Sequence, residues 1–97
     1  MHIISHKKLK EFYDIHPGVK TALEQWFDIV ESANWNCFAD IKKDFNNVDG
    51  IGNQRYVFNI KGNHYRLVVV IQFVIQRVYI RFVGTHSEYD TTDCTTI

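Results

Sequence analysis

The first half of the chain carries apolar residues at helical spacing. The clearest stripe runs through residues 19–33, where apolar side chains recur every three or four positions: Val19, Ala22, Leu23, Trp26, Phe27, Val30 and Ala33. An earlier helix is predicted after Ser5, a suitable N-cap, and Pro17 separates the two because proline suits the first turn of the second. A third, shorter helix, capped by Asn34 or Asn36, would carry Phe38 and Ile41 inward.

The second half has the alternation of strands. Residues 55–60, 65–73 and 77–83 are predicted as three consecutive antiparallel strands, and residues 2–4 as a short first strand. Residues 61–64 form the expected hairpin turn, whose Gly62 and Asn63 suit positive φ, and residues 46–53 contain further turn residues. Gly84 should end the last strand, and residues 86–90 suit a helical turn. Helices followed by strands indicate an α+β fold with helices on one face of the sheet.

Length and composition indicate one domain over residues 1–97. Eleven cationic and eleven acidic side chains give zero net charge, so a polyanion could bind only to a local patch. Cys37 and Cys94 are far apart and form no metal-binding spacing, so we expect free thiols and neither metal nor cofactor. With no signal-peptide pattern and no apolar run long enough to span a membrane, we expect a cytoplasmic protein without a membrane partner.

Charge is segregated along the sequence. Residues 50–87 contain no Asp or Glu and hold seven basic side chains, histidine included: Arg55, Lys61, His64, Arg66, Arg77, Arg81 and His86. Strand alternation predicts that Arg55, Arg66 and Arg81 lie on the face that the helices leave open. His86 and Tyr89 would stand at its rim. The sequence therefore predicts a concave basic surface on the sheet.

Such a surface suits RNA, because guanidinium groups bind phosphate and can stabilise a phosphorane, while a histidine can transfer protons near neutral pH. Structural explanations remain open for the same residues. A single histidine at a strand end is more often a hydrogen-bonding residue than a catalyst. Exposed arginines on sheet edges often prevent strand addition. Tyr56, Tyr65 and Tyr79 are more often packing partners than platforms for bases.

Several blocks of the sequence resemble a known family. They are IISHKKLKEF near the start, WNCFADIK, GNQRYVFNIKGNHYRLVV, VYIRFVGTHSEYD and the final TTI. Together they resemble HigB-type toxins, the mRNA interferases of the RelE/ParE superfamily. The resemblance implies a RelE-like fold, with N-terminal helices packed on one face of a twisted, mainly antiparallel sheet. It also implies a HigA-like helix-turn-helix antitoxin, cleavage of mRNA on the ribosome, and operator DNA bound only through the antitoxin.

The resemblance also implies residue roles. Arg66 matches the superfamily's arginine strand, His86 follows the last strand where a basic residue is common, and Tyr89 lies near the C-terminal tyrosine position. We expect His86, Tyr89, Arg66 and Arg81 to be catalytic. The expected RNA contacts are Arg55, Lys61, Lys43 and His64. Asn59 stands where RelE has a lysine, and Thr91 and Thr92 follow the EYD motif where relatives often have lysine.

Two other functions remain open at this point. The superfamily also contains gyrase-poisoning toxins and inactive partners, in which the sheet would dock a protein. A plain RNA-binding domain is the other alternative, although a small patch on a neutral protein favours a ribosome-assisted reaction over tight independent binding.

Overall fold

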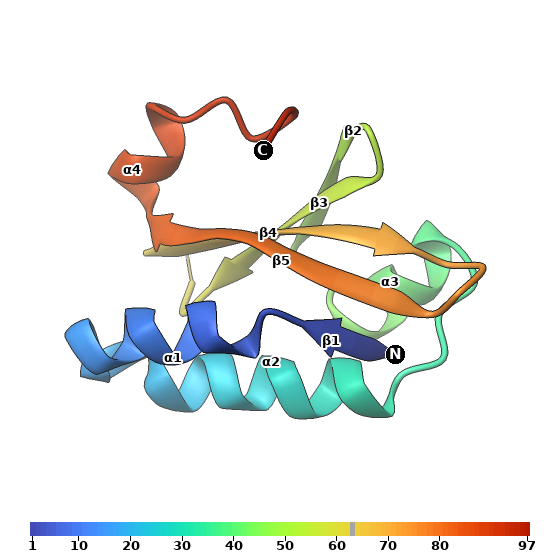
Figure 1. The fold of residues 1–97 in the computed structure, drawn as a ribbon, viewed down its shortest axis with the longest axis horizontal. Helices are drawn as coiled ribbons and strands as arrows, with labels where there is room; N and C mark the ends of the chain where they lie inside the picture. Colours follow the sequence, from blue (N-terminus) through green and yellow to red (C-terminus); the bar gives the residue numbers. More distant parts are fainter. Residues whose placement is uncertain (63) are drawn as a thin grey trace.

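A computed structural model describes residues 1–62 and 64–97 and confirms the α+β fold. One five-stranded sheet has the order β1-β5-β4-β3-β2, in which only the β1–β5 pair is parallel (Figure 1). The strands are β1 (His2–Ile4), β2 (Val48–Gly52), β3 (Arg55–Ile60), β4 (Tyr65–Gln72) and β5 (Arg77–Thr85). The helices are α1 (His6–Ile15), the 3₁₀ turn η1 (Pro17–Val19), α2 (Lys20–Ser32), α3 (Phe38–Asp44) and α4 (His86–Asp90).

Helices α1 and α2 cover one face of the sheet, as predicted (Figure 1). The stripe on α2 supplies Leu23, Trp26 and Val30, all essentially inaccessible to solvent. They pack against Phe58 on β3 and alternate residues of β4, because successive side chains of a strand point to opposite faces. This face holds most of the apolar core. It leaves the other face for polar groups and for the C-terminal part of the chain.

The structure corrects two local predictions in the first half and refines a third. Ser5 is the N-cap of α1, as predicted, but it has a left-handed φ of 76° and makes no side-chain capping bond. Cys37, not Asn34 or Asn36, is the residue before α3. Phe38 is 38% exposed and stacks on Tyr56, while Ile41 is fully buried as expected. Phe38 therefore packs on Tyr56 of β3 at the protein surface and does not enter the core.

Residues 46–53, predicted as a turn, contain the edge strand β2. Val48 is buried opposite Phe58, and this pairing draws the segment into the sheet despite its glycines. The turn itself is shorter: Gly52, Asn53 and Gln54 all have positive φ. The predicted hairpin joins β3 to β4, with positive φ at Lys61 and Gly62, while Asn63 lies outside the described residues.

A β-bulge in β5 changes the predicted facing of its residues. Val68 of β4 pairs with Phe82 and Val69 pairs with Ile80, so Arg81 is the extra residue. Phe82 consequently joins the open face, and Val83 packs toward the helix-covered core. The strand also continues through Gly84 to Thr85 instead of ending there. A Cβ on Gly84 would lie 2.6 Å from the Phe82 ring, so glycine allows this close approach.

After β5 the chain crosses the open face. Helix α4 stands at one end of that face, and the segment after it runs toward β2 and β3 (Figure 1). Cys94 of this segment is buried against Val57 and Val68 in a second, smaller apolar cluster. No helix in the part of the chain that the structure describes is long and apolar enough to cross a membrane.

Candidate active site

Arg66 lies on the open face beneath α4. Its partners in the sheet are Asn59 on β3 and Gly84 on β5, so these three residues form one row at the α4 end. The guanidinium carbon of Arg66 lies 6.0 Å from the centre of the Tyr89 ring, and Nη1 donates to the main-chain oxygen of Tyr65 at 3.3 Å. The predicted Arg66 and Tyr89 are thus brought together, with the cation over the aromatic face.

Helix α4 begins with a capping box. The Glu88 N–H donates to Thr85 Oγ1 at 3.2 Å, and the Thr85 N–H donates to Glu88 Oε1 at 2.8 Å. The hydrogen bond from the Thr85 main chain, joined by one from its hydroxyl, lowers the pKa of the Glu88 carboxyl. This box holds a helix of only five residues at the end of β5, and so it holds His86 and Tyr89 beside the row that contains Arg66.

His86 is paired with a carboxylate. Its Nδ1 lies 2.9 Å from Asp90 Oδ2, one helical turn along, and both side chains are about half exposed at 50% and 58%. The carboxylate orients the imidazole, which leaves the other ring nitrogen to exchange a proton with a ligand. The main-chain N–H of His86 donates to the main-chain oxygen of His64 at 3.1 Å. This bond brings the two predicted residues to the same end of the sheet.

Tyr89 is a neutral phenol at physiological pH. Burial is the main cause that raises its pKa, and the nearby Cys94 and carboxylates act in the same direction, whereas Arg66 opposes them. Burial likewise raises the pKa of the Cys94 thiol beneath it. A protonated tyrosine can donate a hydrogen bond or a proton. The raised pKa of Tyr89 therefore favours the proton-donor role over that of a base.

His16 joins this end of the molecule, and sequence reasoning gave it no site role. Its ring stacks on Phe12 with centroids 4.4 Å apart and meets Tyr65 at 6.0 Å, and its charge contributes to the lowered pKa of Glu88. No local pattern could have found it, because β4 and α4 come much later in the sequence. Lys61 is also anchored here, where Nζ donates to the oxygen of Gly18 at 3.1 Å.

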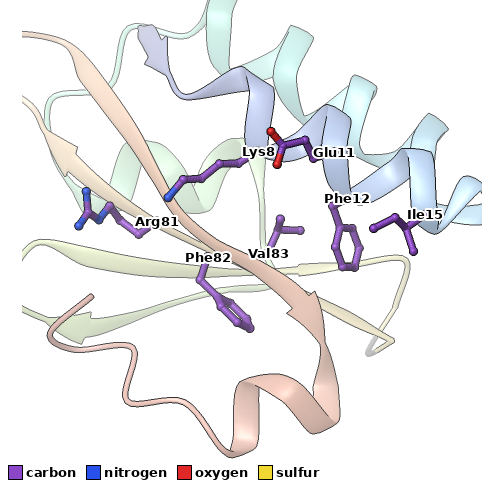
Figure 2. Close-up of a pocket in the computed structure, with 7 residues that line it drawn as sticks. All are labelled: Lys8, Glu11, Phe12, Ile15, Arg81, Phe82 and Val83. Carbon is purple, nitrogen blue, oxygen red and sulfur yellow. The ribbon is translucent and has the colours of Figure 1, made fainter.

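Three other predicted site residues lie elsewhere. Arg81, displaced by the bulge, lines a groove of about 350 Å³ between α1 and β5 together with Lys8 (Figure 2). Lys43 is on α3 and pairs with Asp40 at 3.9 Å. Arg55 is on the open face, but its guanidinium donates to main-chain oxygens of Asn53 and Ile97. The structure therefore gathers His64, Arg66, His86 and Tyr89, and separates Arg81 and Lys43 from them.

Residues 50–87 contain no Asp or Glu, but the open face of the sheet still carries carboxylates from other segments. Asp49 of β2 pairs with Val57 and so lies on the open face, and Asp90 and Asp93 arrive with α4 and the segment after it. On the open face, the described basic side chains of Arg66 and His86 lie at the α4 end. Nowhere in residues 1–62 and 64–97 do three or more His, Cys, Asp or Glu side chains converge as a ligand set for a metal ion.

N-terminal helices packed on one face of a mainly antiparallel sheet agree with the RelE-like toxin fold that the sequence resemblance implies. The sequence model of the HigB toxin, described as the RelE-like toxic component of a toxin-antitoxin system, matches residues 19–92, and the chain belongs to this family. It is 35% identical over 92 residues to the mRNA interferase toxin HigB of Escherichia coli K12, covering 93% of this chain and 88% of that protein. An mRNA interferase HigB of Escherichia coli O6:H1 is 28% identical, with 93% and 89% covered.

Proposed function

We propose that this toxin cleaves mRNA at the α4 end of its open sheet face. The observation that carries the proposal is that Arg66 of β4 contacts the ring of Tyr89 on α4. The first residue of the same short helix is His86, which is paired with Asp90. Relatives that match over nearly the whole chain are mRNA interferases by name. The partner in this system is an antitoxin, and we propose a HigA-like helix-turn-helix protein that alone contacts operator DNA.

Each residue has a role that fits its surroundings. His86, oriented by Asp90, takes the proton of the ribose 2′-hydroxyl, whose oxygen forms a bond to phosphorus. Arg66 stabilises the charge on the pentavalent phosphorane. The bond from phosphorus to the 5′-oxygen breaks, and that oxygen receives a proton from Tyr89, which leaves a 2′,3′-cyclic phosphate and a 5′-hydroxyl. His64 and Lys61 bind neighbouring phosphates from the adjacent hairpin.

The ribosome supplies what this surface lacks. Net charge is zero and the basic groups occupy one end of one face, so electrostatic attraction of free RNA is weak. A ribosome that holds mRNA in an extended form would present a single phosphodiester to that end. We therefore propose cleavage of translated mRNA in the cytoplasm.

The test is His86→Ala, expressed under control and compared with His2→Ala, an exposed histidine on β1. Loss of a proton-transfer group lowers rates by about 10²- to 10⁴-fold. Primer extension on induced transcripts should show new 5′ ends for the parent and for His2→Ala, and none above background for His86→Ala. Thermal unfolding should be unchanged within about 0.5 kcal/mol for both variants.

Two outcomes contradict the proposal. A folded His86→Ala toxin that still produces the same 5′ ends removes His86 from the reaction. Growth arrest with intact transcripts and a DNA-damage response would instead place the chain with the gyrase-poisoning members of its superfamily.

A further inference from the structure

The segment 93–97 lies across the open face and is held by side chains of the β2–β3 hairpin. It runs from α4 toward β3, red in Figure 1. Asn53 Nδ2 donates to the main-chain oxygen of Thr95 at 2.9 Å, and Arg55 Nε donates to that of Ile97 at 3.1 Å, joined by Nη2. These bonds connect positions about forty residues apart in the sequence.

Arg55 has no guanidinium nitrogen left without a bond in this arrangement. Nη1 donates to the oxygen of Asn53 at 2.8 Å, while Nε and Nη2 are both directed to Ile97. A guanidinium often binds phosphate through two parallel N–H groups. Here the paired Nε and Nη2 groups hold the main chain of Ile97 instead. Arg55 therefore acts on the open face through the segment.

The segment is also anchored by packing. Cys94 is only 4% exposed and fills the space over Val57 and Val68, and Ile97 and Tyr89 border the same cluster. Asp93 shapes the backbone, because its Oδ1 accepts from the Thr95 N–H at 3.1 Å and from the Thr95 hydroxyl at 2.6 Å. Since Tyr89 belongs to this cluster, the position of the segment and the position of the Tyr89 ring are linked.

Charge divides the open face in two. Asp49 and Asp93 are exposed on the side where the segment lies, whereas His64 and Arg66 are at the α4 end of β3 and β4. A phosphodiester backbone is attracted to the second region and repelled from the first. The segment 93–97 therefore blocks RNA sterically, and the nearby carboxylates of Asp49 and Asp93 repel its phosphates.

We propose that the segment 93–97, held by Arg55 and Asn53, is the wall that limits how far RNA extends over the open face and so determines which phosphodiester reaches His86. This inference rests on the proposed mRNA cleavage and assigns Arg55 and Asn53 as positioning residues. A strand confined between the wall and α4 has few registers in which its ribose 2′-oxygen and phosphorus align with the site, and alignment is what an oriented reaction requires.

The experiment compares Arg55→Ala, Asn53→Ala and a chain that lacks residues 93–97 with the parent toxin. Arg77→Ala is the matched control, because Arg77 is an exposed arginine of β5 that lies at the opposite side of the sheet. Each is induced at low level, and all cleavage positions on one reporter transcript are mapped by primer extension. The three test variants should add new positions, with the ratio of secondary to main cleavage rising about tenfold, the discrimination that one pocket contact provides.

Several results would overturn the inference. If the cleavage pattern is unchanged in every folded variant, the segment 93–97 does not determine which phosphodiester is cleaved. If Arg55→Ala removes cleavage while the shortened chain still cuts, Arg55 binds RNA directly. Should the shortened chain fail to fold, the two single substitutions decide the question alone.

A double variant separates this inference from the proposed function. Adding His86→Ala to Arg55→Ala should remove the main and the additional cleavage positions together. Cleavage that survives His86→Ala in the parent background contradicts the proposed reaction itself, whatever the pattern in the Arg55 variant. An unchanged pattern in Arg55→Ala, with cleavage still dependent on His86, contradicts only the wall.

Discussion

The two faces of the sheet are covered in different ways. On one face α1 and α2 bury a continuous aromatic core in which Phe58 meets Trp26, Trp35 and Phe45 with ring centroids 5.1–6.3 Å apart. On the other, a five-residue helix and a short segment cover a small cluster centred on Val57, Val68 and Cys94. Neighbouring residues of one strand, such as Val57 and Phe58, therefore contribute to two cores of very different size.

This difference separates stability from chemistry. The helix-covered face removes large aromatic side chains from water, which is the dominant favourable contribution to folding. The open face keeps Arg66, His86 and Asp90 accessible and is held by a capping box and a few hydrogen bonds. The proposed reaction site is thus built on the face with the smaller apolar cluster, while the other face holds most of the core.

The largest effect should come from Phe58→Ala. The substitution removes the ring at the centre of the aromatic core and leaves a cavity, so we expect the free energy of unfolding to fall by about 3–5 kcal/mol. Chemical denaturation followed by tryptophan fluorescence measures it, because Trp26 and Trp35 both lie in this core. Cleavage should be lost in proportion to the unfolded fraction and restored at lower temperature.

The control is His86→Ala, which should show the opposite pattern, with normal stability and no cleavage. A Phe58→Ala protein that stays fully folded yet inactive would mean that the helix-covered core also shapes the reaction site, and the separation of the two faces would fail.

Local patterns in the sequence predicted the large face better than the small one. The helical stripe of α2 and the alternation of β3 and β4 identify the core residues, since both depend on a regular period. The bulge at Arg81 has no such signature, and it reverses the facing of Phe82 and Val83. The edge strand β2 was missed because its glycines and asparagine neighbours favour turns, whereas pairing with β3 decides its structure.

The candidate site shows the same limit. His86, Tyr89 and Arg66 could be chosen from residue chemistry and resemblance, and the structure brings them to one end of the open face. The contacts of His16 with Tyr65 and of Arg55 with Ile97 join residues about forty to fifty positions apart. Only the folded chain places them together, so their roles could not be predicted from spacing.

Val69→Ala and Val68→Ala compare the two faces at adjacent positions. Both side chains are fully buried, Val69 in the large core and Val68 in the small one. Each substitution removes two methyl groups, worth about 1.5 kcal/mol in transfer free energy. Val69→Ala should cost about 2 kcal/mol or more because the aromatic core cannot close the cavity, whereas Val68→Ala should cost only the transfer free energy of about 1.5 kcal/mol because the segment 93–97 can settle into the space. Equal losses in denaturant unfolding would show that the segment is as rigid as the helices.

The smallest effect should be the contribution of Glu88 to the pH dependence of the free energy of unfolding. Hydrogen bonds from Thr85, with a contribution from His16, lower the pKa of the Glu88 carboxyl in the folded protein, so the native state favours the ionised form. Its stabilisation is fully present above the unfolded pKa of about 4.3 and is lost as the pH falls through the lower, folded value. Because the group is almost fully exposed, Glu88→Gln should cost only a few tenths of a kcal/mol at neutral pH.

Glutamine can still accept the Thr85 N–H, so this variant removes the charge and keeps the capping bond, while Glu88→Ala removes both and should cost about 0.5–1 kcal/mol. The melting temperatures of the parent and Glu88→Gln should differ at pH 7 and converge as the pH falls through the lowered folded pKa of Glu88, below which the parent carboxyl is protonated too. A difference that persists or grows in acid would mean that the Glu88 charge does not stabilise α4. The capping box would then hold His86 and Tyr89 through its hydrogen bonds alone, and the open face would lack this source of acid sensitivity.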